Sequence, residues 1–219
     1  MLITGAARGT GRIFANAIAL YDVELILADN DGPLLAQAAR ELSAHSMFCD
    51  TQSTSSIEIF EAQFVEQFDR LHMLVSAADS GHGRILSTVR MTAAFLPLLR
   101  RTPGARVIVN VASGEDCSAK TPFQYTGSPE ATICYSDYLR SSLKGSAITV
   151  ETLFPQLNHT VETCRETIEP FVGQVLRDFT PESAKRCSAS HVTRPSRRGE
   201  RSSSGKDLSK SPRRLGGSQ

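Results

Sequence analysis

TGAARGTG, the stretch from Thr4 to Gly11, decides the fold of this chain. It directly follows a short apolar run at 2–4 and opens a helical segment whose body spans 12–21. Glycine at positions 5, 9 and 11 removes side chains where a backbone must turn tightly and approach a pyrophosphate. The helix that follows would aim its N-terminal N–H groups and positive dipole end at the phosphates. The expected contacts are Gly5, Arg8, Gly9, Thr10 and Gly11.

Outward from this turn, short apolar runs alternate with segments of helical periodicity as far as residue 155. The run VIVNVA at 107–112 does not alternate with polar residues, which is typical of a parallel strand covered on both faces. The alternation, without internal repeats, predicts a single-domain α/β fold, a Rossmann-type doubly wound parallel sheet. The expected strands are 2–4, 23–28, 46–49, 73–77, 106–112 and 148–154. The expected helices are 12–21, 57–71, 91–99, 133–143 and 162–179, the last interrupted at Pro170.

An acidic residue ends the second expected strand. Asp29, in LILADND, lies 24 residues after Gly5, where a carboxylate can accept hydrogen bonds from both ribose hydroxyls of NAD. Its charge would repel a 2′-phosphate, so NAD is the expected cofactor. Arg8 keeps NADP possible, because a cation in the glycine loop can favour a phosphate. Without a ligand, the same residues would be a glycine turn and a capping aspartate.

These features resemble the classical short-chain dehydrogenase/reductase (SDR) family from Met1 to about Pro155. The spacing G-x-x-x-G-x-G is similar to that of the family, as are CDT at 49–51, LVSAAD at 74–79, VIVNVAS at 107–113 and FP at 154–155. The resemblance implies hydride transfer between a nicotinamide cofactor and an unidentified alcohol or carbonyl. It also implies that Asp50, Thr51 and Ala77 bind the cofactor. Tyr125, twelve residues after Ser113, would be the general acid/base, and Ser113 would hold the substrate oxygen.

Pro129 stands where the family has its catalytic lysine. A free tyrosine titrates near ~10, so without that cation little tyrosinate exists at neutral pH. The triplet SPE at 128–130 is also typical of a helix start, which would leave Tyr125 in the preceding turn. Arg84 aligns with the family's helix asparagine, and Asp79 replaces a family glycine. Tyr125 and Ser113 therefore have a second interpretation, as a loop tyrosine and a turn serine.

Two functions follow from these observations. The first is an NAD(P)-dependent oxidoreductase of low activity. The alternative is a non-catalytic pseudoenzyme or scaffold that kept the glycine loop and binds a dinucleotide. The five histidines have no metal-ligand spacing, so no metal is expected. The five dispersed cysteines favour reduced thiols and a cytoplasmic location, and no segment has the character of a membrane span. The resemblance also implies a homo-oligomer, formed through helices around 91–100 and 129–144.

Charge divides the chain into a domain at 1–180 and a tail at 181–219. The tail carries ten Lys or Arg, three Asp or Glu and ten serines, a net charge of +7. The remaining 180 residues hold 14 basic and 20 acidic residues, a net charge of −6. The tail has almost no large apolar side chains, so we expect it to be disordered. A basic tail could bind nucleic acid or another polyanion weakly, but such a composition is more often that of a solvated extension without a role.

Overall fold

The computed structural model describes residues 1–77, 84–104, 106–111, 129–153 and 161–177. Strands and helices alternate strictly along this part of the chain. They are β1 (Leu2–Thr4), α1 (Gly9–Ile18), β2 (Ile26–Asp29), α2 (Gly32–Leu42), β3 (His45–Phe48), α3 (Thr54–Gln67), β4 (Met73–Ser76), α4 (Arg84–Arg101), β5 (Arg106–Val111), α5 (Pro129–Ser142), β6 (Ile148–Leu153) and α6 (Val161–Arg177). Each expected strand is present to within about three residues at either end.

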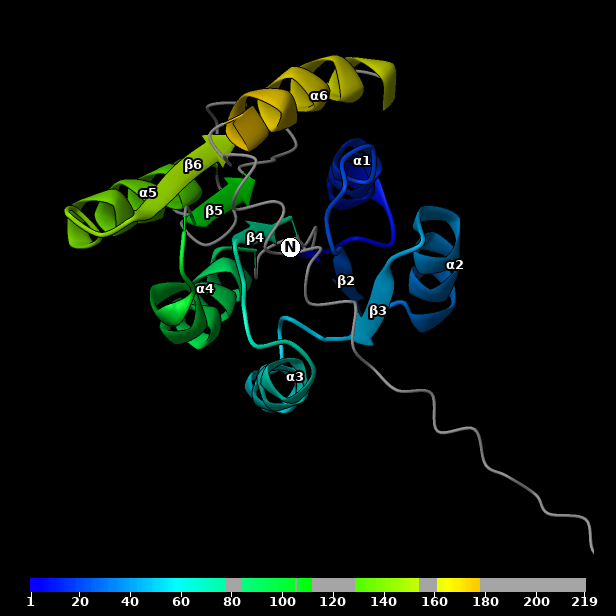
Figure 1. The fold of residues 1–219 in the computed structure, drawn as a ribbon, viewed down its shortest axis with the longest axis horizontal. Coiled ribbons are helices and arrows are strands. Elements are labelled where there is room, and N and C mark those ends of the chain that lie inside the picture. Colours follow the sequence, from blue (N-terminus) through cyan, green and yellow to red (C-terminus); the bar gives the residue numbers. More distant parts are fainter. Residues whose placement is uncertain (78–83, 105, 112–128, 154–160, 178–219) are drawn as a thin grey trace, which may run out of the picture.

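All strand pairs in the sheet are parallel, and the order is β3-β2-β1-β4-β5-β6. Helices α1, α2 and α6 cover one face, and α3, α4 and α5 cover the other (Figure 1). This arrangement confirms the predicted Rossmann-type doubly wound α/β fold. The division into residues 1–180 and a tail remains a prediction, because positions 178–219 lie outside the described residues.

Burial on both faces explains why the four inner strands, β2, β1, β4 and β5, are largely apolar. In β1, Leu2 belongs to the core on the side of α3 and α4, whereas its neighbour Ile3 belongs to the core on the side of α1 and α6. Neighbouring side chains of a strand point to opposite faces of the sheet, so both must be apolar when helices cover both faces. Under α3 and α4, Phe64 lies edge-on to Phe95 with ring centroids 5.0 Å apart. The helix expected at 57–71 therefore does pack on the core, although it spans Thr54–Gln67.

Helix α6 continues through Pro170 from Val161 to Arg177, so the predicted interruption is wrong. Proline removes one backbone hydrogen bond and crowds the preceding turn. Packing against α1 offsets that cost, because Phe171 meets Phe14 edge-on at 6.1 Å and Ile168 is fully buried. Tertiary contacts decide the extent of a helix more strongly than one unfavourable residue does.

Candidate functional site

Most of the predicted cofactor contacts meet at the carboxyl edge of the sheet. The glycine loop follows β1, Asp29 ends β2, Asp50 and Thr51 follow β3, and Ala77 follows β4. Strand β1 lies between β2 and β4, and the chain runs outward from it in both directions. In open α/β sheets a ligand binds in the crevice at such a reversal of strand order. The structure therefore brings these side chains to the end of the fold where a ligand is expected.

The backbone of the loop after β1 requires its glycines. Gly5 and Gly9 have φ values of 65° and 56°, in the left-handed region that side chains disfavour. A Cβ atom at Gly11 would lie 2.0 Å from the carbonyl oxygen of Gly5, closer than any real contact. The three glycines thus let α1 begin directly against the end of β1. This is the close approach that a dinucleotide-binding turn needs.

Helix α1 begins without a side-chain cap. Arg8 is its N-cap residue and its side chain makes no capping hydrogen bond, while its carbonyl accepts the first helical bond from the N–H of Arg12 at 3.2 Å. The first N–H groups of a helix have no partner within the helix. Together with the positive end of the helix dipole, these groups suit a phosphate. Thr10, in this first turn, is 3% exposed and so lies beneath the surface of the site.

Asp29 joins two segments of the site. Its Oδ2 accepts a hydrogen bond from the N–H of Ala7 at 3.0 Å, and its Oδ1 accepts one from the N–H of Asp31 at 3.0 Å. The residue is 7% exposed. A carboxylate has about four acceptor positions, so further lone pairs can accept from ribose hydroxyls. The spacing that predicted Asp29 gives no sign of its bond to the glycine loop, because that bond depends on the relative positions of β1 and β2.

Asp31 also belongs to the site, although none of the sequence motifs above includes it as a ligand. Its Oδ2 lies 3.4 Å from Nη2 of Arg8. Its Oδ1 accepts from the N–H of Leu34 at 3.2 Å and caps α2. The motif DGP at 31–33 is a recognisable helix start that could have revealed the cap. The ion pair with Arg8 could not be predicted in the same way, because no sequence motif joins the two residues.

The loop after β3 is ordered by its own hydrogen bonds. Oδ1 of Asp50 accepts from the N–H of Gln52 at 3.0 Å, and the backbone N–H of Asp50 donates to Ser56 Oγ at 3.0 Å. From α4, Nη1 of Arg90 donates to the Gln52 carbonyl at 2.7 Å. Burial, reinforced by the charge of Asp50, raises the pKa of the Cys49 thiol to about 12. Cys49 therefore stays protonated at neutral pH and is no candidate nucleophile.

The predicted catalytic residues Tyr125 and Ser113 lie outside the described residues, as does Asp79. Strand β5, which precedes Ser113, is fixed to α5 by a buried polar contact. Nδ2 of Asn110 donates to Ser136 Oγ at 2.9 Å, and that hydroxyl donates to the Thr132 carbonyl at 2.7 Å. The two elements that flank the predicted catalytic residues therefore have a fixed relative position.

Helix α5 carries no lysine, at Pro129 or elsewhere along its length. Within the described range 129–153 the sequence holds one lysine, Lys144, which follows the end of α5. Helix α5 has 14 residues, so Lys144 and Pro129 are separated by about 20 Å along the axis.

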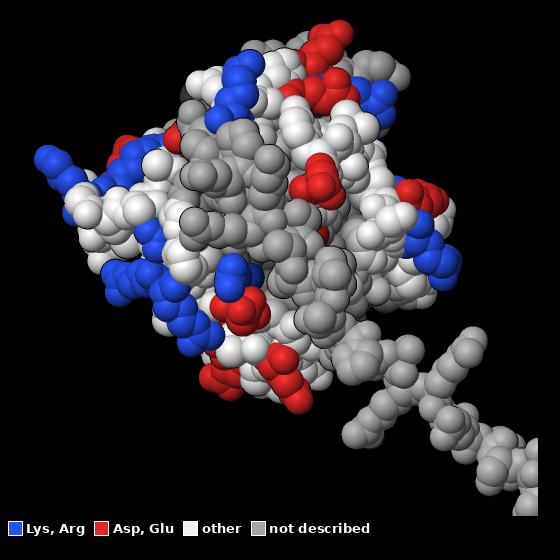
Figure 2. All heavy atoms as spheres, viewed as in Figure 1, with Lys and Arg blue, Asp and Glu red and all other residues white. Residues whose placement is uncertain are grey.

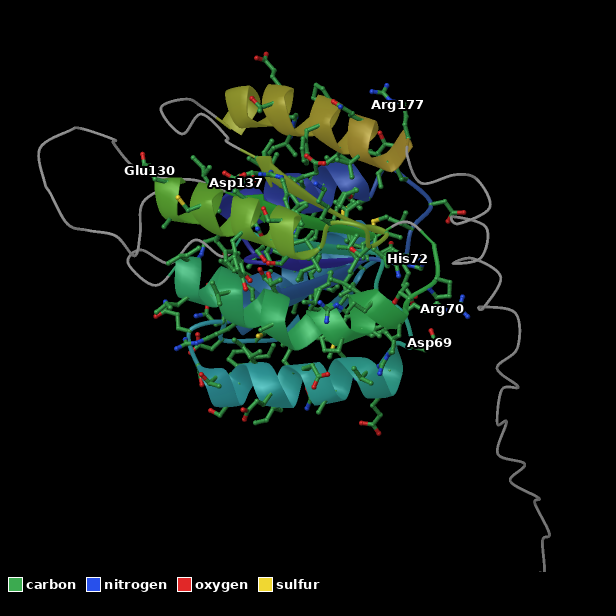
Figure 3. The ribbon with its side chains drawn as sticks, turned by 90° about the vertical axis from the view of Figure 1, so that its left-hand side faces the viewer. Asp69, Arg70, His72, Glu130, Asp137 and Arg177 are labelled. Carbon is green, nitrogen blue, oxygen red and sulfur yellow. The ribbon has the colours of Figure 1, made fainter. Side chains whose placement is uncertain are left out.

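Glu130 and His72 mark opposite ends of the sheet in Figure 3. Burial lowers the pKa of His72, and its position ahead of β4 places it far from the glycine loop.

Other kinds of site find no support in the described part of the chain. No group of three or more His, Cys, Asp or Glu side chains there could hold a metal ion. None of the helices described is long and apolar enough to cross a membrane. On the coloured part of the face in Figure 2, basic and acidic side chains are intermixed. A phosphodiester backbone prefers a continuous basic surface, which that face does not offer.

Comparisons with known proteins agree with this geometry. The family model described as short chain dehydrogenase matches residues 1–167. Among curated proteins, the chain is similar to the probable oxidoreductase EphD of Mycobacterium bovis. The two are 27% identical over 222 residues, which cover 82% of this chain and 37% of EphD. The chain thus spans little more than a third of the length of that relative.

Solved structures show the same fold. A short chain dehydrogenase/reductase from Burkholderia phymatum, in complex with NAD, superposes with a TM-score of 0.59 and 19% identity over 77% of this chain and 78% of that one. A metagenomic short-chain oxidoreductase, in complex with NADP, superposes with a TM-score of 0.65 and 20% identity over 80% of this chain and 88% of that one. At these identities the likeness concerns the fold alone.

Proposed function

Because this chain belongs to the short-chain dehydrogenase family, we propose that it is an oxidoreductase that uses NAD(H), with NADP(H) as the weaker cofactor. Its substrate would be a small alcohol or carbonyl compound, and its turnover would be slow. The observation that carries the proposal is the uncapped N-terminus of α1, which begins directly against the glycine loop. Such a terminus is a binding site for phosphate groups.

The residues present fit a dinucleotide. The diphosphate would lie over Gly9 and the first N–H groups of α1, where the glycines leave the backbone accessible. The carboxylate of Asp29 would accept from the ribose hydroxyls while it keeps its bonds to the backbone. Asp50 and Thr51 would border the adenine, and Ala77 would border the cofactor at the end of β4. The two superposed structures hold NAD and NADP, which supports a nicotinamide cofactor here too.

A bound nicotinamide supplies hydride transfer, and the protein has to position the substrate and move a proton. In the direction of alcohol oxidation, Tyr125 would take the hydroxyl proton as the carbon–hydrogen bond breaks. Ser113 would hold the substrate oxygen by a hydrogen bond. Both roles come from the family resemblance. With Pro129 in place of the lysine, the charge that favours the ionised tyrosine in the family would be missing at that position.

A second candidate function is a dinucleotide-binding protein without catalysis, that is, a pseudoenzyme or scaffold. Pro129 favours it, because the described part of α5 offers no lysine at the end nearest the site. The glycine loop and Asp29 would serve this function equally well. Turnover of a small-molecule substrate therefore distinguishes the two candidate functions, whereas cofactor binding does not.

The proposal also covers the assembly of the protein, its cellular location and its binding of polyanions. We propose a homo-oligomer in the cytoplasm, since the family often assembles through the helices corresponding to α4 and α5. The buried, protonated thiol of Cys49 is consistent with a reducing compartment. Weak binding of polyanions through residues 181–219 rests on their charge of +7 alone.

A comparison of turnover tests the proposal. The wild type, Tyr125→Phe and Pro129→Lys are assayed with NADH and NAD⁺ against short-chain ketones and alcohols. Loss of a tuned acid/base removes ~10²–10⁴-fold in rate, so the wild type should be slow by that factor and Tyr125→Phe slower still. Pro129→Lys should give partial rescue only, because Arg84 still stands where the family has asparagine. Equal, negligible rates for wild type and Tyr125→Phe would favour the non-catalytic dinucleotide-binding protein.

A further inference from the structure

Three charged side chains meet where the 2′-position of a bound adenosine ribose would lie. Asp29 ends β2, Asp31 follows two residues later, and Arg8 extends from the glycine loop. The guanidinium of Arg8 is paired with Asp31 at 3.4 Å, and their side chains are 65% and 26% exposed. One cation thus stands beside two carboxylates. The local net charge is −1, which opposes a phosphate and tolerates a hydroxyl.

The two aspartates have different parts in this cluster. Each carboxylate oxygen of Asp29 accepts one hydrogen bond from a backbone N–H group, whereas the ion pair of Arg8 is with Asp31. Asp31 carries the ion pair and, through its Oδ1, the cap of α2. Its backbone N–H in turn donates to Asp29. Asp31 is therefore the residue that decides whether the guanidinium of Arg8 is free for an incoming anion.

We propose that Asp31 sets the cofactor preference by holding Arg8, and this inference rests on the proposed dinucleotide binding. A free arginine binds phosphate oxygens through two parallel N–H bonds, and such charge-assisted bonds are strong. An arginine already paired with a carboxylate has to leave that partner first. The Arg8–Asp31 pair therefore disfavours NADP(H), and loss of the Asp31 charge converts Arg8 into a 2′-phosphate ligand.

Asparagine is the substitution that isolates the charge. Asn is as good a helix N-cap as Asp, so Asp31→Asn keeps an acceptor for the N–H of Leu34 and preserves α2. The backbone N–H that donates to Asp29 is also unchanged. Asp22→Asn is the matched control, because Asp22 is exposed and lies between α1 and β2, at the opposite edge of the sheet. It changes the net charge by the same amount.

The experiment measures dissociation constants for NADH and NADPH by fluorescence with five proteins. They are the wild type, Asp31→Asn, Arg8→Gln, the double variant and Asp22→Asn. Asp31→Asn should shift the NADPH/NADH affinity ratio toward NADPH by about tenfold, the effect of gaining one charged hydrogen bond. The shift should disappear in the double variant, be absent in Asp22→Asn, and shrink as salt is raised.

The outcomes separate this inference from the proposed function. An unchanged ratio in Asp31→Asn, with both cofactors still bound, overturns the role of Asp31 and leaves dinucleotide binding intact. A shift that persists in the double variant also overturns it, because Asp31 would then repel the phosphate directly and not act through Arg8. If the wild type binds neither NADH nor NADPH, the proposed function and the inference fall together.

Discussion

The carboxylate of Asp29 accepts a hydrogen bond from the backbone N–H of Ala7 at 3.0 Å and thereby fixes the glycine loop to the end of β2. Asp29 therefore stabilises the fold even without a ligand. Asp29→Ala should lower the free energy of unfolding by about 1–3 kcal/mol, since two backbone N–H groups lose their acceptor in a largely buried place. Urea denaturation measures this. Asp22→Ala is the control, and an equal, small loss in both variants would show that Asp29 has no structural role.

Two glycines at helix starts should respond differently to alanine. Gly11→Ala places a Cβ atom 2.0 Å from a backbone oxygen, so the loop and α1 must separate. We expect a loss of at least about 2 kcal/mol in stability and of NADH binding. Gly32→Ala, at the start of α2, places its Cβ atom in open space and should be neutral or stabilising by up to about 1 kcal/mol. The thermal midpoints of both variants test this prediction. Equal shifts in the two variants would contradict the close approach of Gly11 to the Gly5 carbonyl.

His72 should make stability depend on pH. Burial, and then the positive charges of the N-terminus and Arg70, lower its pKa in the folded protein. A base with a depressed folded pKa contributes stability that is present above its unfolded pKa and lost as the pH falls. We therefore expect stability to decline as the pH drops below about 6.5. His72→Gln should flatten that part of the profile, measured by denaturation between pH 7.5 and about 5. A profile of identical slope in both proteins would exclude His72 as the cause.

Much of the fold was accessible to prediction from the sequence, because burial on two faces makes each inner strand a short, largely apolar run. The run at 107–112 predicted β5 within one residue of Arg106–Val111. The continuous helix through Pro170 was not predictable, since it depends on contacts between Phe171 and α1. The site was predictable where the backbone accepts one residue type only, as at Gly5, Gly9 and Gly11. The pairing of Arg8 with Asp31 joins two loops and has no counterpart in sequence spacing.

Residues 181–219 should be dispensable for folding. Their composition provides no core, and their ten basic residues favour solvent over burial. A chain that ends at residue 180 should keep its thermal midpoint within a few degrees of the full chain, as measured by circular dichroism. Loss of the cooperative transition on truncation would show that these residues pack on the domain. Any binding of the full chain to heparin should weaken steeply between low and physiological salt.

The central claim is that a dinucleotide binds over the start of α1. Backbone hydrogen exchange with and without NADH tests both the binding and its place. At a few millimolar NADH, which exceeds a dissociation constant of up to about 1 mM, peptides covering residues 5–18 should exchange more slowly. Peptides covering 69–73, at the opposite edge of the sheet, should not change. Absence of protection anywhere with NADH and NADPH, or protection confined to residues 69–73, would contradict the account.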